Sequence, residues 1–173
     1  MDIVQGFADP KEFKFIELEL LQPEWTKRYF ELKFDEELLA TIQWPTWFKT
    51  TAHGKTAFGE WTIKRVGIFK PKISVRLKGS KRDLYVLKMK SYRKGTIQMD
   101  DRKVVWDYIQ MWKSEVGWIE NDRDVMTFRL SYSLTKKRFA KIRMIKTDYS
   151  EEELSVLLLV GLYMIHMIAQ SNG

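Results

Sequence analysis

The sequence predicts a mainly β protein: a closed antiparallel barrel of about 12 strands around a central hydrophobic α-helix at the carboxy terminus. Three observations lead to this prediction. From residue 12 to 146 the apolar residues recur with a period close to two and are of the branched and aromatic types that suit pleated sheet. The links between these runs are short, which implies antiparallel neighbours. Residues 154–169 are apolar on nearly every side of a helix, and such a helix must be enclosed.

Turn-forming residues separate the apolar runs along the first 146 residues. Lys78-Gly79-Ser80 and Asp100-Asp101-Arg102 are examples, since Gly tolerates positive φ and Asp forms turns with its own backbone. The alternation breaks near Ala140, where a β-bulge would restore it. No linker or internal repeat divides the chain, so we expect a single domain over residues 1–173. Eleven runs are predicted as strands, and the barrel allows for one more: 13–21, 25–34, 38–44, 56–66, 72–78, 83–91, 95–99, 103–114, 117–121, 125–133 and 138–146.

A helix over about residues 150–170 decides the fold. Ser150 and Glu153 have the spacing of a capping box, and Glu residues fill the first turn at the positive end of the helix dipole. The apolar stretch rises about 24 Å, short of the ~30 Å of a bilayer core, and no Lys or Arg follows it as an anchor. We therefore expect protein, not lipid, to surround it. A closed barrel covers every side of such a helix and removes exposed sheet edges.

Two residues of this helix carry specific expectations. A narrow stripe runs along Ser155, Leu159, Leu162, His166 and Gln170, and it marks where polar partners must lie. His166 is predicted to be neutral and hydrogen-bonded to a backbone carbonyl or a strand side chain, rather than a ligand for a metal. Gly161 lies away from the stripe and is predicted to let a strand or a large aromatic ring approach the helix axis.

Charge is unevenly distributed along the chain. Residues 1–40 carry 5 basic and 10 acidic residues, whereas residues 62–94 carry 12 basic residues and Asp83 as the one acidic residue. Such asymmetry indicates a basic face that would attract phosphate, lipid headgroups or nucleic acid. The alternative is that these side chains are simply the solvated side of strands. The candidate ligand-binding residues on this face are Lys64, Arg65, Lys88, Lys90, Arg93 and Lys94.

Several kinds of chemistry are excluded or unsupported by composition. The chain has no Cys, which excludes disulfides, thiolate metal sites and a cysteine nucleophile, and it has 2 His residues. No phosphate-binding loop, nucleophile elbow or metal motif occurs. We therefore expect no catalytic residues, metal or cofactor, and no enzyme. Asp100-Asp101 and the pair Asp122/Asp124 are read as hairpin turns rather than paired catalytic carboxylates. The aromatic segment 44–48 is read as a loop folded over the barrel end, with a recognition patch as the alternative.

The pattern of the whole chain resembles the tubby-like superfamily, which includes the tubby carboxy-terminal domain, LURP-one-related proteins and phospholipid scramblases. The resemblance rests on GEWTIKRVGIFKPKISVR (59–76) and EEELSVLLLVGLYMIHMI (151–168). It implies a twelve-stranded barrel around a hydrophobic helix, and it implies binding of phosphoinositide headgroups by surface Lys and Arg. The chain lacks the cysteine-rich stretch of scramblases and has no clear counterpart of their acidic calcium segment, so the resemblance does not imply lipid scrambling.

The sequence thus predicts a non-enzymatic binding module that recognises anionic lipid headgroups or another polyanion through its basic face. Two alternatives remain open. Basic strands bearing Tyr85, Tyr92, Trp106 and Trp112 could stack single-stranded nucleic acid, although core positions suit these aromatics better. The terminal helix could instead be a membrane tail anchor, although no transmembrane span is favoured. The amino terminus resembles no secretory signal, so we expect a cytoplasmic location that is peripheral to membranes if lipid is the partner.

Overall fold

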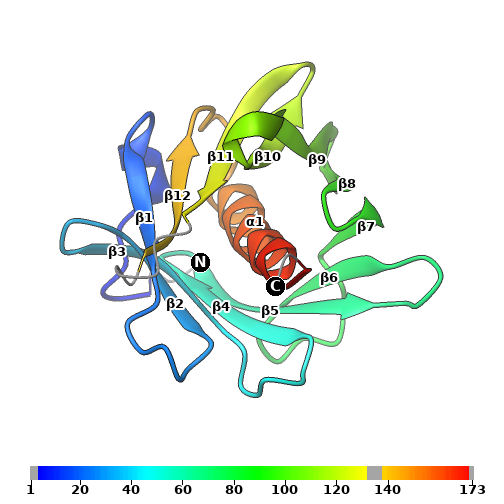
Figure 1. Cartoon of the computed structure of the whole chain (residues 1–173), viewed down its shortest axis with the longest axis horizontal. Helices are drawn as coiled ribbons and strands as arrows, with labels where there is room; N and C mark the ends of the chain where they lie inside the picture. Colours follow the sequence, from blue (N-terminus) through cyan, green and yellow to red (C-terminus); the bar gives the residue numbers. More distant parts are fainter. Residues whose placement is uncertain (1–3, 132–137, 172–173) are drawn as a thin grey trace.

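The computed structural model describes residues 4–131 and 138–171. It is a closed antiparallel barrel of twelve strands around one carboxy-terminal helix, as predicted (Figure 1). Two short 3₁₀ helices, η1 (Pro10–Phe13) and η2 (Met111–Lys113), flank strands, and α1 spans Glu151–Ser171. The strands are β1 (Glu17–Leu21), β2 (Tyr29–Phe34), β3 (Glu37–Gln43), β4 (Thr51–Thr56), β5 (Gly59–Val66), β6 (Lys72–Leu77), β7 (Tyr85–Ser91), β8 (Lys94–Met99), β9 (Arg102–Gln110), β10 (Glu115–Glu120), β11 (Arg123–Leu130) and β12 (Arg138–Met144).

Each strand pairs with its neighbours in the sequence, and β1 pairs with β12 to close the barrel. This up-and-down order follows from the short connections that the sequence predicts. The predicted bulge is present in the β1–β12 pair: Leu20 pairs with Ala140 and Leu21 with Arg138, so Phe139 is the extra residue. A bulge at this point restores the inward direction of the apolar residues that follow it.

The strand that the sequence analysis missed is β4. Its sequence, TAHGKT, has no large apolar residue, yet its burial alternates, with Ala52, Gly54 and Thr56 turned inward. Small side chains are needed here because the helix lies close: a β-carbon on Gly54 would fall 2.8 Å from a methyl group of Leu159. The expected strand over 103–114 is also shorter, since β9 ends at Gln110 and η2 follows.

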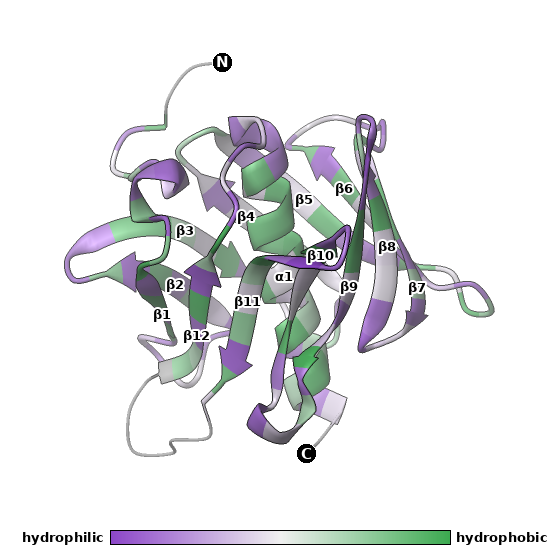
Figure 2. Ribbon diagram, turned by 90° about the horizontal axis from the view of Figure 1, so that it is seen from above, coloured by the Kyte–Doolittle hydropathy of each residue, from purple (hydrophilic) through white to green (hydrophobic). Residues whose placement is uncertain are grey.

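The helix lies inside the barrel, and every residue from 153 to 168 is buried. Figure 2 shows it as a mostly apolar rod enclosed by strands whose hydropathy alternates. The predicted capping box is present, because the Ser150 amide donates to Glu153 Oε2 (2.9 Å) and the Glu153 amide donates to Ser150 Oγ (3.1 Å). By length and composition α1 could cross a membrane, but 78% of its most apolar stretch is buried in the protein.

The polar stripe and the helix glycine both find the partners that the sequence predicts. Ser155 is hydrogen-bonded to Thr56 on β4, with 2.9 Å between the two hydroxyl oxygens. Gly161 faces the ring of Phe128 on β11, which stands where a β-carbon would otherwise lie. The helix is therefore fixed in rotation as well as in position.

Candidate functional site

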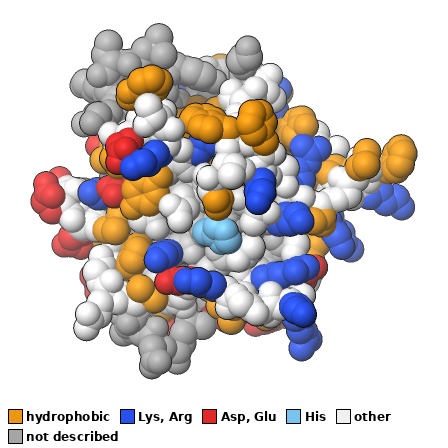
Figure 3. Space-filling view, turned by 90° about the horizontal axis from the view of Figure 1, so that it is seen from below, with side chains coloured by type: hydrophobic (Ala, Val, Ile, Leu, Met, Phe, Trp, Pro, Cys, Tyr) orange, Lys and Arg blue, Asp and Glu red, His pale blue; other side chains and the backbone are white. Residues whose placement is uncertain are grey.

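Three of the predicted basic residues lie together on the outer surface of the barrel. Lys64 on β5 and Lys88 and Lys90 on β7 are exposed, because their neighbours in sequence turn inward. Lys72 on β6 joins them, directly opposite Lys88 in the β6–β7 ladder. Figure 3 shows the side of the barrel that is at the bottom of Figure 1, with Lys and Arg gathered mainly over its right half and Asp and Glu mostly at its left edge.

The loop between β5 and β6 adds an apolar tip to this surface. Ile68 and Phe69 are 88% and 97% exposed, and Lys70 beside them is exposed as well. Gly67 begins the turn with φ +84°, and the Pro71 carbonyl accepts a hydrogen bond from the Met89 amide. The tip is thus held on a fixed hairpin base, and Figure 3 shows hydrophobic and basic side chains side by side at the projecting right edge.

The other three predicted residues are each engaged by a neighbouring side chain. Arg65 lies on the inward side of β5, opposite the buried Ile73, and its guanidinium lies 3.1 Å from the Tyr92 hydroxyl at the barrel end. The guanidinium of Arg93 lies over the ring of Tyr108. Lys94 is ion-paired with Asp107. The structure therefore divides the predicted site: Arg65 takes the inward side of its strand, whereas Lys94 stays on the outer side of β8 but is neutralised by Asp107.

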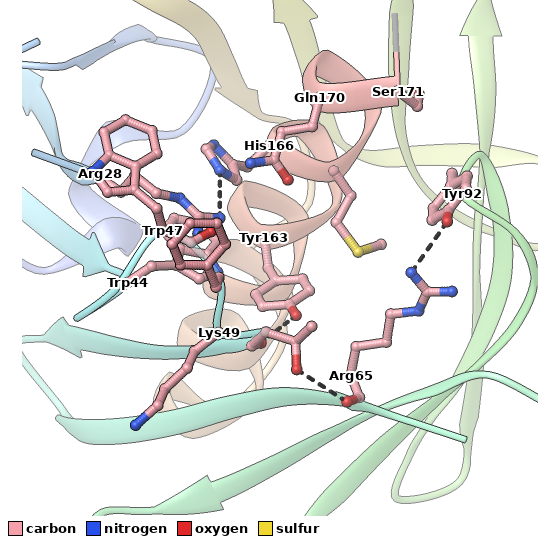
Figure 4. Close-up of a pocket in the computed structure, with 13 residues that line it drawn as sticks. Arg28, Trp44, Trp47, Lys49, Arg65, Tyr92, Tyr163, His166, Gln170 and Ser171 are labelled. Atoms are coloured by element: carbon pink, nitrogen blue, oxygen red, sulfur yellow. Dashed lines mark hydrogen bonds between the residues drawn. The ribbon is translucent and has the colours of Figure 1, made fainter. Parts of the chain in front are cut away.

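A second candidate site opens at the end of the barrel where α1 terminates. It is a cavity of about 280 Å³ (Figure 4). Its floor comes from the last turns of α1, one wall from the β3–β4 loop, and the opposite wall from β5 and the β7–β8 turn. The lining residues are Arg28, Trp44, Trp47, Phe48, Lys49, Thr50, Arg65, Tyr92, Tyr163, His166, Met167, Gln170 and Ser171. We call this cavity the barrel-mouth pocket.

Arg28, which directly precedes β2, is the central cation of the barrel-mouth pocket. It is 6% exposed, and one terminal nitrogen donates to the carbonyl oxygens of Thr46 (3.2 Å) and Trp47 (2.8 Å). Its guanidinium lies over the ring of Trp44, 4.9 Å from the centroid. Burial lowers the pKa of Arg28, but a guanidinium stays protonated at neutral pH. Among the described residues no carboxylate pairs with it.

His166 completes this cluster from the floor of the pocket. Its Nε2 lies 2.9 Å from the other terminal nitrogen of Arg28, and its ring stacks on Trp44. Since Arg28 can only donate, Nε2 must accept, and the imidazole is neutral with its proton on Nδ1. Burial, together with the charge of Arg28, lowers the pKa of His166 to about 3. The expected hydrogen-bonded histidine is present, but the expected partner is wrong: it is neither a backbone carbonyl nor a strand side chain, but Arg28, which directly precedes β2.

The opposite wall is also cationic and is tied to the floor. The Thr50 hydroxyl donates to the Arg65 carbonyl (3.4 Å), and the Tyr163 hydroxyl donates to the Thr50 carbonyl. Burial raises the pKa of Tyr163 to about 12, so this hydroxyl keeps its proton. Lys49 lines the pocket as a third cation. Described lining residues include three cations and no Asp or Glu, so the pocket is electropositive.

The aromatic loop 44–48 partly follows its predicted role. Trp44 is buried over the barrel end, as expected, whereas Trp47 is 57% exposed and Phe48 99% exposed. Arg28 was not singled out in the sequence, because nothing near it in the chain indicates its partners. The one signal available was the polar stripe of α1, which required a partner for His166.

The remaining acidic candidates behave largely as turn residues. Asp100, Asn121 and Asp122 have positive φ in hairpin turns, as predicted, whereas Asp124 lies within β11. Within residues 4–131 and 138–171, no group of three or more His, Asp or Glu side chains is placed to hold a metal ion.

Comparison with known proteins gives no relative from which a function could be transferred. No family model, curated protein or solved structure matches the chain.

Proposed function

We propose that the protein is a non-enzymatic binding module that docks on anionic membrane surfaces. The docking surface is the basic hairpin face, which consists of Lys64, Ile68, Phe69, Lys70, Lys72, Lys88 and Lys90. The observation that carries the proposal is the apolar tip: two adjacent large hydrophobic side chains are almost fully exposed among lysines. An interfacial anchor needs both parts, since apolar side chains enter the acyl boundary while cations remain at the headgroups.

The charge pattern of this face supports the proposal. Lys72 and Lys88 stand directly opposite each other, and like charges in that arrangement destabilise a sheet. In the part of the chain that the structure describes, neither they nor Lys64, Lys70 and Lys90 form an ion pair. Elsewhere on the barrel, cations are commonly neutralised, as Lys141 is by Glu17. Lys72 lies near enough to Asp83 to help lower the pKa of that carboxylate, but no lysine around the apolar tip is ion-paired in the described chain, and such a surface suits an anionic bilayer.

The two alternative functions have less support from the same geometry. Stacking of nucleic acid needs a row of exposed rings, but Trp106 is fully buried and the Tyr85 hydroxyl is bound to Glu152. The expectation of core positions is wrong for Trp112, which is 82% exposed, and for Tyr92, which is 41% exposed. A tail anchor would require α1 to leave the barrel and expose the apolar inner faces of all the strands.

The resemblance to the tubby-like superfamily agrees with this proposal. A twelve-stranded barrel around a hydrophobic helix is the architecture that the resemblance implies, and lipid headgroups are the partners it implies. We propose membership of that superfamily and a cytoplasmic protein that associates peripherally with membranes.

Vesicle sedimentation tests the proposal. We expect the protein to sediment with vesicles of phosphatidylcholine plus phosphatidylserine, and much less with phosphatidylcholine alone. The double variant Lys72→Gln/Lys88→Gln should bind roughly 30-fold more weakly at low salt, since each cation near the surface contributes about 1 kcal/mol. The matched control is Lys14→Gln/Lys103→Gln, which removes the same charge from exposed positions outside the face and should bind much more like wild type.

The contribution of the apolar tip can be measured separately, by vesicle binding at high salt. The variant Ile68→Ser/Phe69→Ser should lose the part of the binding that persists at high salt, because insertion of apolar groups is not screened. Equal sedimentation with both vesicle types, or equal losses in the face and control variants, would contradict the proposal.

A further inference from the structure

The barrel-mouth pocket shares no residue with the basic hairpin face, and its chemistry is different. The hairpin face is a convex surface of solvated lysines, whereas the pocket is a concave site with a buried arginine in its lining. Membrane docking therefore does not account for the pocket.

Arg28 is the first sign of an absent counter-charge. A cation that is 6% exposed is costly to keep unless an anion accompanies it. Here carbonyl oxygens, a neutral imidazole and the face of Trp44 take that place. These groups orient the guanidinium without neutralising it, and Arg65 adds a second positive charge on the opposite wall, with Lys49 at the rim pointing outward (Figure 4).

Unused hydrogen-bond donors are the second sign. Arg28 Nε and His166 Nδ1 are both buried and have no hydrogen-bond partner among the described residues. The first always carries a proton, and the second carries one because Nε2 accepts from Arg28. Buried donors are nearly always paired in folded proteins, so these two unpaired N–H groups leave the positive potential beneath the cavity without a compensating acceptor.

The walls of the pocket indicate which chemical group is attached to the anion. Trp47 and Tyr92 stand on opposite sides of the pocket, and Tyr163 lies on its floor (Figure 4). Each ring has a polar contact: the Arg28 guanidinium lies over Trp47, 5.8 Å from the ring centroid, Arg65 donates to the Tyr92 hydroxyl, and the Tyr163 hydroxyl donates to the Thr50 carbonyl. Aromatic walls favour a flat ring by stacking, and a cavity of about 280 Å³ admits a small molecule only.

We infer that the barrel-mouth pocket binds a small aromatic oxyanion, that is, a planar ring that carries a phosphate or carboxylate group. The oxyanion lies above the buried positive charge of Arg28, with the guanidinium of Arg65 on the opposite wall as the second cation. The ring lies among the aromatic walls. This site would make the protein a receptor for a soluble ligand in addition to a membrane-docking module.

Titration of the full chain with phenyl phosphate, benzoate and phenol tests the inference. Calorimetry gives the affinity, and the fluorescence of the pocket tryptophans reports the site. We expect phenyl phosphate or benzoate to bind, phenol to bind at least tenfold more weakly, and the better of the two anions to identify the group. Failure of wild type to bind either anion, or equal binding of phenol, would overturn the inference.

Two variants locate the site without disturbing the buried cluster. Arg65→Gln should weaken anion binding about tenfold, because it removes a charge from the pocket wall, and Lys49→Gln should weaken it less, because that side chain points away from the cavity (Figure 4). Lys103→Gln, on the outer face of β9, is the control and should bind like wild type. Lys72→Gln/Lys88→Gln should also bind the soluble anion normally, so that failure of vesicle docking and failure of pocket binding are distinguished. Unchanged affinity in both pocket variants would refute the assignment.

Discussion

The ring of Phe128 on β11 packs directly against the α-carbon of Gly161 in the middle of α1. A β-carbon at position 161 would come within 3.0 Å of three atoms of that ring. Both residues are fully enclosed, and Phe128 also contacts Trp106 with 5.3 Å between ring centroids. The ring therefore has little room to withdraw, and this contact sets the distance between the helix and the β10–β11 side of the barrel.

Gly161→Leu should consequently destabilise the protein severely. Overpacking in a close-packed core costs about 1–3 kcal/mol, and here the added atoms meet a confined ring. Urea denaturation measures the change in the free energy of unfolding. The double variant Gly161→Ala/Phe128→Leu should be more stable than the sum of its single changes predicts, because the smaller side chain makes space. Wild-type stability of Gly161→Leu would show that the helix is not packed this tightly.

The barrel and its helix could be predicted because their signals are local. Alternation along each strand, turn residues between strands and an all-round apolar helix are each visible within a few residues. β4 escaped prediction for a physical reason: Ala52, Gly54 and Thr56 face inward where the helix leaves no space, so the strand lacks the large residues that reveal its neighbours. The strand lacks large apolar residues because α1 lies close to it.

The pocket could not be predicted because it depends on contacts between distant parts of the chain. Arg28 and His166 are 138 positions apart and meet only when the barrel closes around α1. The division of the predicted basic residues has a similar origin. Lys64 and Arg65 are adjacent in sequence but lie on opposite faces of β5. Lys64 therefore belongs to the basic hairpin face, and Arg65 lines the barrel-mouth pocket.

Substitution of Lys88 tests whether the lysines that bind the membrane also lower the free energy of unfolding. Lys88→Gln should raise the free energy of unfolding by a few tenths of a kcal/mol at low salt, because it relieves repulsion with Lys72. The gain should shrink in high salt, where the repulsion is screened. The same variant should weaken vesicle binding. Urea denaturation at two salt concentrations, paired with sedimentation, measures both effects.

Lys103 provides the matched control for this comparison. It is exposed on β9 and lies opposite Gln98, so Lys103→Gln relieves no like-charge pair. It should leave both stability and vesicle binding nearly unchanged. If Lys88→Gln were instead destabilising, or if both variants behaved alike, repulsion between Lys72 and Lys88 would not lower the stability of the folded protein.

His166 should make stability depend on pH. Its pKa is lowered to about 3 by burial and by Arg28, whereas in the unfolded chain it has the ordinary value of about 6.5. Between these values the unfolded state binds a proton that the native state does not. The free energy of unfolding should therefore fall as pH falls below about 6.5, by about 1.4 kcal/mol per pH unit. The other titratable side chain on this floor, Tyr163, has a raised pKa of about 12 and stays neutral throughout.

His166→Gln isolates this contribution, since the amide oxygen can still accept from Arg28 but does not titrate. Denaturation curves at pH 6.5 and pH 5 should show wild type losing roughly 1.6 kcal/mol more than the variant. Glu17, Glu60 and Asp83 have lowered pKa values, because lysines, or Ser74 and Arg76 for Asp83, donate hydrogen bonds to them. Their stabilisation is lost only at lower pH and is common to both proteins. Parallel losses in wild type and variant over this interval would mean that His166 accepts a proton in the folded barrel, and that Arg28 does not hold Nε2 as an acceptor.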